Sequence, residues 1–357
     1  MSSPAPERIA RRRAARARRT RRRRRVGAGL ALVALAAVLV WLVLSESSSR
    51  HAGTAPAAST SRGGASRRAA ARVHIVITES GQLPAAVQDA AAAPAGSAGV
   101  LLIGGLDRDE TSVADVIQID GGDVRRIGAL STALHDACAS AVAGQVYVFG
   151  GGQLTSFSQI LRVGSSGTAQ PVGSLPTRAS DVACTTVRGI VYIVGGYTGQ
   201  EPLRTIVSWR PGGTPRIVAM LPKPLRYATV GQSGGQVMIA GGTSGLQASR
   251  DVYGFDPRSG KVRQLARLPY PVTHAAGASL GGSLLVIGGR GASPGSQTRD
   301  VLGISPTGAV SVVGKLPRAL SDMAAVPSGE AAVVLAGGRD NTGRVQNSSF
   351  TITLERQ

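Results

Sequence analysis

The sequence predicts an all-β fold, a six-bladed β-propeller of four-stranded antiparallel blades, preceded by a single transmembrane helix. Three observations support this prediction. An apolar run that ends in a glycine doublet recurs six times, strands of small residues precede these runs, and nineteen uncharged residues follow an arginine-rich start. Repeats of about 40 to 50 residues that contain several short strands are typical of propeller blades. An apolar fraction of 43% in 357 residues is enough for a large core.

Residues 1–25 form an arginine-rich tail, which we expect to lie in the cytoplasm. Twelve arginines against one acidic residue, Glu7, give the tail a charge of +11 out of a formal +20 for the whole chain. Residues 26–44 carry no charged side chain, and a helix of this length spans about 28 Å, close to the hydrocarbon core of a bilayer. Because arginine is enriched on cytoplasmic flanks, we expect a single-pass protein of the cell membrane whose remainder lies outside the cytoplasm.

Two other interpretations of this region stay open. Residues 26–44 have the position of a cleaved signal peptide, although the apolar part of such a peptide usually has about 7 to 15 residues. The arginines have the charge of a nucleic-acid-binding arm, but they adjoin an apolar segment, where anionic lipid head groups attract each of them by about 1 kcal/mol. We therefore expect the membrane, with anionic lipid on the tail, as a partner, and no nucleic acid.

Residues 45–71 predict a flexible linker, because they consist mostly of Ser, Ala, Gly and Arg and hold almost no large apolar side chain. Residues 72–357 are periodic and predict the propeller. A Leu-Pro pair lies about 20 residues before most of the doublets. The doublets are 45 to 49 residues apart, and their first glycines are Gly104, Gly150, Gly195, Gly241, Gly288 and Gly337.

The fifth repeat shows the four strands expected of one blade. The segments "THAAGASL" and "SLLVIGG" predict the first two strands, and "DVLGISP" and "AVSVVGKLP" predict the third and fourth. First strands hold small residues instead of the branched and aromatic ones that strands usually prefer, which indicates crowding where the blades converge on a central axis. The glycine doublet indicates a second crowded point, at the end of the second strand, where another segment approaches the backbone.

The sixth repeat ends at its third strand, "SSFTITLERQ". Residues 72–79, "RVHIVITE", form a lone strand before the first Leu-Pro pair. We expect this strand to complete the sixth blade, because closing the ring removes an exposed sheet edge.

The repeats resemble the kelch family, whose motif is an apolar strand that ends in Gly-Gly, followed by a third strand that ends in a pattern like Tyr-x-x-Asp-Pro. Tyr253, Asp256 and Pro257 match that ending. The resemblance implies the propeller fold and allows more than one role, because kelch propellers include partner-binding platforms, a sialic acid epimerase and the copper-radical galactose oxidase. Copper chemistry needs clustered histidines, but His135 and His274 lie in different repeats, so we expect no metal and no cofactor.

Six residues recur fourteen or fifteen residues before the doublets, where the innermost strands are expected to begin: Asp89, Asp136, Asp181, Tyr227, His274 and Asp322. Loops on the same face add polar residues around the predicted channel mouth: Arg108, Asp109, Gln153, Tyr197, Glu201, Arg290, Arg339 and Asp340. A concave polar mouth predicts a binding site for a glycan, a peptide or a small molecule. Aspartates at strand entrances also hydrogen-bond the backbone amides of turns, and this structural interpretation stays open.

The two cysteines of the chain, Cys138 and Cys184, lie in the small-residue strands of neighbouring repeats, twelve and eleven residues before their doublets. A location outside the cytoplasm favours a disulfide between them. The offset of one residue favours two separate buried thiols instead, so both interpretations stay open.

These features together predict a membrane-anchored platform that binds a protein or a glycan at the cell envelope, with no catalytic residue assigned. The alternative is a carbohydrate-active enzyme, similar to an epimerase, in which paired carboxylates of the channel mouth act as acid and base. The short loops favour binding over catalysis.

Overall fold

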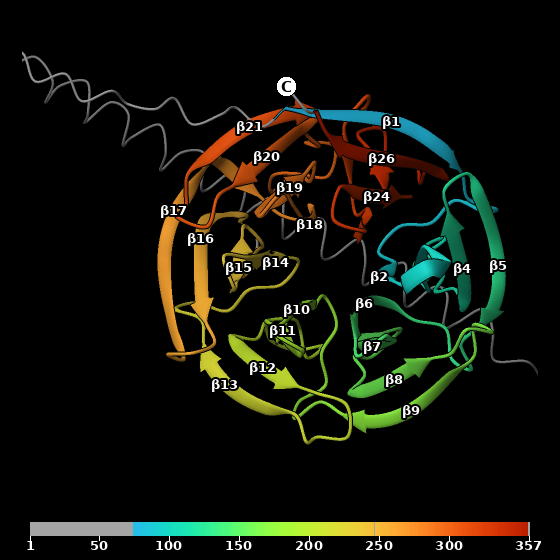
Figure 1. The fold of residues 1–357 in the computed structure, drawn as a ribbon, viewed down its shortest axis with the longest axis horizontal. Coiled ribbons are helices and arrows are strands. Elements are labelled where there is room, and N and C mark those ends of the chain that lie inside the picture. The colour runs from blue at the N-terminus through green and yellow to red at the C-terminus, as the bar shows by residue number, and fades with distance from the viewer. Residues whose placement is uncertain (1–73, 246, 356–357) are drawn as a thin grey trace, which may run out of the picture. The chain divides into compact units, whose positions relative to one another are not determined.

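The structure is a computed structural model that describes residues 74–245 and 247–355. Six four-stranded antiparallel sheets surround a central channel, as the sequence predicts (Figure 1). The predicted tail (1–25), transmembrane segment (26–44) and linker (45–71) lie outside the described residues. Within the described part of the chain, no helix is long and apolar enough to cross a membrane.

Each blade runs from an innermost strand beside the channel to an outermost strand at the circumference. The first blade contains β2 (Ala91–Pro94), β3 (Val100–Ile103), β4 (Asp115–Asp120) and β5 (Asp123–Ala129). The second contains β6 (His135–Val142), β7 (Gln145–Gly152), β8 (Gln159–Val163) and β9 (Ala169–Ser174). The third contains β10 (Ala183–Val187), β11 (Ile190–Val194), β12 (Thr205–Trp209) and β13 (Arg216–Met220). The fourth and fifth contain β14 (Thr229–Ser233), β15 (Gln236–Ala240), β16 (Ser249–Asp256) and β17 (Lys261–Val272); and β18 (Ala276–Leu280), β19 (Ser283–Ile287), β20 (Asp300–Ile304) and β21 (Val310–Lys315).

The sixth blade joins the two ends of the described chain. It contains β23 (Ala324–Ser328), β24 (Ala332–Ala336), β26 (Ser348–Leu354) and, as its outermost strand, β1 (Ile75–Gln82). β1 pairs antiparallel with β26, from Ile75 opposite Leu354 to Gln82 opposite Ser348. The predicted closure of the ring by the first strand is therefore confirmed, with bounds three residues later than expected (Figure 1).

The apolar core lies between neighbouring blades. Between the second and third blades, for example, the buried indole of Trp209 on β12 meets two rings from β7 edge-on, with centroids 4.8 Å from Tyr147 and 5.3 Å from Phe149. Such pairs add about 0.5 to 1.5 kcal/mol beyond the burial of their area. Each blade thus packs its central strands on those of the next blade.

The glycine doublets end the second strand of each blade at a point of close backbone approach. Gly195 has a φ of +62°, and a Cβ there would lie 2.1 Å from the carbonyl oxygen of Leu225, which precedes the next blade. The same oxygen accepts a hydrogen bond from the N–H of Gly196 at 2.8 Å. The doublet therefore ties each blade to the chain that enters the next one, as the sequence predicts.

Every outermost strand carries a β-bulge. In the first five blades the extra residue is apolar: Ile127, Val172, Val218, Leu265 and Val313. A bulge increases the local twist and disrupts pairing at a sheet edge, which makes these edges poorer templates for association with other chains.

Candidate functional site

Six residues form a ring at one end of the channel, each immediately before or at the start of an innermost strand. This channel ring consists of Asp89, Asp136, Asp181, Tyr227, His274 and Asp322, and all six adopt the left-handed conformation, with φ between 51° and 60°. Asp and His tolerate this conformation better than most side chains, whereas a bulky residue such as Tyr227 is strained in it. The left-handed backbone at these positions therefore explains why Asp recurs there.

Backbone hydrogen bonds connect the channel ring from blade to blade. The N–H of Asp136 donates to the carbonyl of Asp89 at 3.0 Å, and the N–H of Asp89 donates to the carbonyl of Asp322 at 2.9 Å. The series continues from Asp322 to His274 at 2.9 Å, and from there through Tyr227 to the carbonyl of Asp181. Since five of the six left-handed turns direct their amide to the preceding blade, the backbone itself holds the side chains at the channel.

The ring side chains line a cavity of about 160 Å³ together with the first residues of the innermost strands. Their carboxyls bind other side chains. Asp136 accepts a hydrogen bond from the hydroxyl of Tyr227 at 3.1 Å, and Asp322 accepts one from the hydroxyl of Ser321 at 2.5 Å. These two carboxyls therefore bind side-chain hydroxyls.

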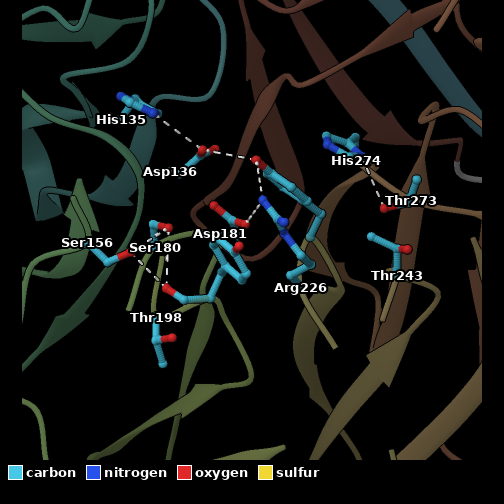
Figure 2. Close-up of polar contacts among 12 residues, drawn as sticks. His135, Asp136, Ser156, Ser180, Asp181, Thr198, Arg226, Thr243, Thr273 and His274 are labelled. Atoms are coloured by element: carbon cyan, nitrogen blue, oxygen red, sulfur yellow. Dashed lines mark hydrogen bonds and ion pairs between the residues drawn. The ribbon is translucent and has the colours of Figure 1, made fainter. Parts of the chain in front are cut away.

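An ion pair lies beside the Asp136 contact. The guanidinium of Arg226 contacts the carboxylate of Asp181, which is 4% exposed, and donates to the hydroxyl of Tyr227 at 3.5 Å. It also lies 4.1 Å from the centroid of the Tyr197 ring. Figure 2 shows Asp136, Arg226 and Asp181 close together at this site. A cation and two carboxyls therefore share one partly buried site.

His274 continues the site on the other side of Tyr227. The two rings are stacked, with centroids 3.7 Å apart. Arg290 donates to Nε2 of His274 at 3.1 Å, and because a guanidinium only donates, the imidazole proton lies on Nδ1, facing Thr273 Oγ1 at 3.1 Å. Burial, and then the charges of Arg290 and Arg226, lower the pKa of His274 to about 2, so this imidazole is neutral.

Three carboxyls of the channel ring, those of Asp89, Asp136 and Asp322, have a raised pKa. Burial raises the pKa of Asp136 well above its usual value, and the charge of the adjacent Asp181 raises it further. Burial followed by the charge of Asp322 does the same to the pKa of Asp89. Burial also raises the pKa of Asp322, although Ser321 and Arg290 oppose this effect. The ring therefore mixes carboxylic acids that can donate a proton with groups that accept one.

The predicted loop residues divide into two groups. Tyr197 and Arg290 contact the channel ring or Arg226, as described above. Arg339 turns away, because it donates to Glu110 at 2.9 Å and to the carbonyl of Gly343 at 3.0 Å, which links the loops of the sixth and first blades. Arg108 is exposed in the loop after the first doublet.

Sequence reasoning did not single out Arg226 or His135 as site residues. His135 Nε2 lies 3.6 Å from Asp136, and burial lowers the pKa of its imidazole. Both residues directly precede a member of the channel ring. The other repeats hold Gln88, Ser180, Thr273 and Ser321 at this position, so the signal was a charged or titratable side chain in two repeats alone.

The channel widens at its other end. There a cavity of about 600 Å³ is lined mainly by Ala, Gly, Ser and Thr of the innermost strands and their hairpins. Its hydroxyls bond one another across blades, as Ser140 does with Thr186 at 2.8 Å, and Thr186 also donates to the carbonyl of Ala141 at 2.9 Å. The titratable chemistry of the channel is thus concentrated at the ring end.

Cys138 and Cys184 form a disulfide between β6 and β10, with Cα atoms 5.8 Å apart. Cys184 lines both cavities, so the bond lies in the channel wall between the two ends. Among the described residues, no group of three His, Cys, Asp or Glu side chains is arranged to hold a metal ion.

A family model for the kelch motif matches residues 178–212 and 224–269, which correspond to the third and fourth blades. The propeller carries kelch motifs. The resemblance to kelch propellers noted from the glycine doublets is confirmed. A solved structure entitled "Structure of YjhT" is similar in fold, with a TM-score of 0.67 and 15% identity over 77% of this chain and 99% of that chain. No curated protein matches the sequence.

Proposed function

We propose that this kelch propeller is a binding platform held at the cell membrane by residues 26–44, with its ring end open to a hydroxyl-rich ligand such as a cell-envelope glycan. The observation that supports this proposal is the gathering of four carboxyls, a phenol and an imidazole around one small cavity, with the guanidinium groups of Arg226 and Arg290 bound to two of them. Sugar hydroxyls both donate and accept hydrogen bonds, so a polyol can satisfy every member of such a mixed set.

The geometry favours a ligand that enters from the loop side. Arg226 keeps 27% of its side chain exposed, whereas Asp181, its ion-pair partner, keeps 2%. The guanidinium of Arg226 is therefore available for first contact, and Asp181 holds it in place. A ligand that carries a carboxylate or phosphate beside its hydroxyls would pair with the guanidinium groups.

Saturation-transfer NMR on the full chain in detergent micelles tests this proposal. Soluble fragments of cell-wall glycan and of acidic envelope polysaccharide serve as probes. Arg290→Gln should weaken binding of the active fragment at least tenfold, since it removes a cation at the mouth, while Arg258→Gln on the exposed outer edge serves as the matched control. Absence of saturation transfer to every fragment, or equal weakening by both variants, would contradict the proposal.

A second candidate function is catalysis on a sugar, and the raised pKa values of Asp89 and Asp136 favour it. A protonated carboxyl beside a carboxylate is the arrangement of an acid and a base. Enzymatic activity would appear as new anomeric or epimeric proton signals when a bound sugar is followed by NMR over hours. Asp136→Asn should then abolish turnover and preserve binding; a bound sugar that stays unchanged with the wild-type protein would exclude this second function.

A further inference from the structure

The outermost strand of the third blade exposes an unusual set of apolar side chains. Ile217, Val218 and Met220 on β13 are 49%, 40% and 49% exposed. The equivalent residues of the fourth blade are Gln264, Leu265 and Arg267 on β17, because the pairing register of β13 with β12 is the same as that of β17 with β16. Val218 and Leu265 are the extra residues of the two bulges. The fold therefore accepts polar or charged residues at two of these three positions. Folding does not by itself require the apolar side chains that β13 carries there.

Basic side chains surround this apolar strip. Arg204, Arg210 and Arg216 are exposed in the third blade, and Lys261 and Arg263 are exposed on β17, which contacts β13 at the circumference (Figure 1). We call these five residues, with Ile217, Val218 and Met220, the basic edge. On the opposite side of the ring, β4 and β5 expose charges of both signs, Asp120 and Asp123 together with Arg125 and Arg126. The apolar strip of β13 thus lies beside a cluster of basic side chains.

The combination of exposed apolar residues with arginine and lysine fits the surface of an anionic bilayer. Apolar side chains enter the boundary between head groups and acyl chains, and each basic residue near such a surface gains about 1 kcal/mol. We propose that the basic edge binds the surface of a membrane that contains anionic lipid. This proposal is independent of the ligand site, because the edge lies on the outer circumference and the ring end lies on the axis.

Other occupants fit these observations less well. A second copy bound through the same edge would form an isologous contact, and would bring Arg216 and its basic neighbours against their own counterparts. Binding of single-stranded nucleic acid uses exposed aromatic rings, but the aromatic residue nearest in sequence, Trp209, is 3% exposed. An anionic lipid surface satisfies both the charge and the apolar strip.

Membrane contact through this edge would orient the propeller. Because β13 and β17 lie on the circumference (Figure 1), the channel axis would run parallel to the bilayer, and both ends of the channel would open sideways.

Depth-dependent fluorescence quenching tests the proposal on the full chain reconstituted with vesicles. Both native cysteines are in the disulfide, so Val218→Cys provides a single labelling site for a small fluorophore. Val172→Cys is the matched control, because Val172 occupies the same bulge position on β9 and is 43% exposed. Vesicles of phosphatidylcholine with and without phosphatidylglycerol carry doxyl-labelled lipid as the quencher.

We expect at least threefold more quenching at position 218 than at position 172 in vesicles that contain phosphatidylglycerol. Replacing both Arg216 and Arg263 by Gln should reduce the difference at least twofold, as should 0.5 M salt. Equal quenching at the two positions, or quenching at 218 that is the same without phosphatidylglycerol, would overturn the proposal. If unlabelled Val218→Cys chains form disulfide-linked dimers and the labelled chains show less quenching as dimers accumulate, the edge binds a second copy and the proposal is overturned.

Discussion

The two ends of the channel are built from the same six innermost strands, yet they differ in chemistry. At the ring end, six side chains in left-handed turns crowd a cavity of about 160 Å³ with titratable groups. At the wide end, small residues leave about 600 Å³, and hydroxyls bond one another. The strands account for the channel, and the single residue before each strand accounts for the chemistry.

The difference shows where a propeller can change its function without changing its fold. The residues at the ring end are held by backbone hydrogen bonds, so their side chains are free to vary between Asp, Tyr and His. The small residues of the innermost strands pack against the neighbouring blade, where a Cβ at Gly277, for example, would lie 2.6 Å from Cγ2 of Thr229. The following predictions test this division, beginning with the largest expected effect.

Alanine at a glycine should be far more damaging at the ring end than at the wide end. Gly195→Ala places a Cβ 2.1 Å from the carbonyl oxygen of Leu225, and both sides of this contact are backbone. We expect a loss of more than about 3 kcal/mol in the free energy of unfolding, or no folded protein. Gly189→Ala, in a hairpin at the wide end with a φ of +74° and open space around its Cβ, should cost about 1 to 2 kcal/mol. Urea unfolding monitored by tryptophan fluorescence measures both, and equal losses would contradict the close approach.

The disulfide between the two ends should have the next largest effect. Cys138→Ala with Cys184→Ala releases a crosslink between residues 46 apart in sequence, and the expected loss is about 2 to 4 kcal/mol. Wild-type protein treated with reductant should unfold at the same denaturant concentration as the double variant. An unchanged midpoint after reduction would show that the backbone ring alone holds the second and third blades together.

The ring end should make stability depend on pH. An aspartate with a raised pKa keeps its proton in the folded state after the unfolded chain has lost it, so stability falls as pH rises above about 4 and through the folded pKa. Asp89→Asn removes one such group, keeps a side chain that tolerates the left-handed turn, and should flatten this fall. At pH 8 the melting temperature should rise by about 2 to 4 °C for each kcal/mol gained.

The wide end provides the control for this pH effect. Thr185 lines the larger cavity and does not titrate, so Thr185→Ala should leave the slope of melting temperature against pH unchanged. A flattened slope in both variants, or in neither, would mean that the raised pKa values of the ring end do not govern the pH dependence.

The smallest effect is expected from the hydroxyls of the wide end. Thr186→Val removes the bonds to Ser140 and to the carbonyl of Ala141. The open cavity allows water to replace the lost partner, so we expect a loss of about 0.5 to 1.5 kcal/mol and unchanged ligand binding. A loss above 3 kcal/mol would show that these hydroxyls, like the glycine doublets, are required for the ring to close.

The propeller could be predicted because its signals are local and repeat. A glycine such as Gly195 or Gly241 is required by a backbone contact that recurs in each blade. The residues of the channel ring could also be found from the sequence, because each lies at nearly the same distance before a glycine doublet. The contacts within the ring could not be predicted in the same way. Arg226 reaches Asp181 of the preceding blade, and no second repeat carries an arginine at that position. The pKa of Asp136 depends on burial and on its distance from Asp181, neither of which a linear pattern contains.

The placement of β1 in the sixth blade has a consequence for biosynthesis. Its partner strand, β26, comes from residues 348–354, so β1 is made early in translation and the other three strands of its sheet are made late. Until these three strands emerge, β1 has no sheet to join and the ring is open. A chain that lacks residues 348–354 would therefore leave β1 without its partner strand, and proteolysis should remove it far faster than a chain that contains them.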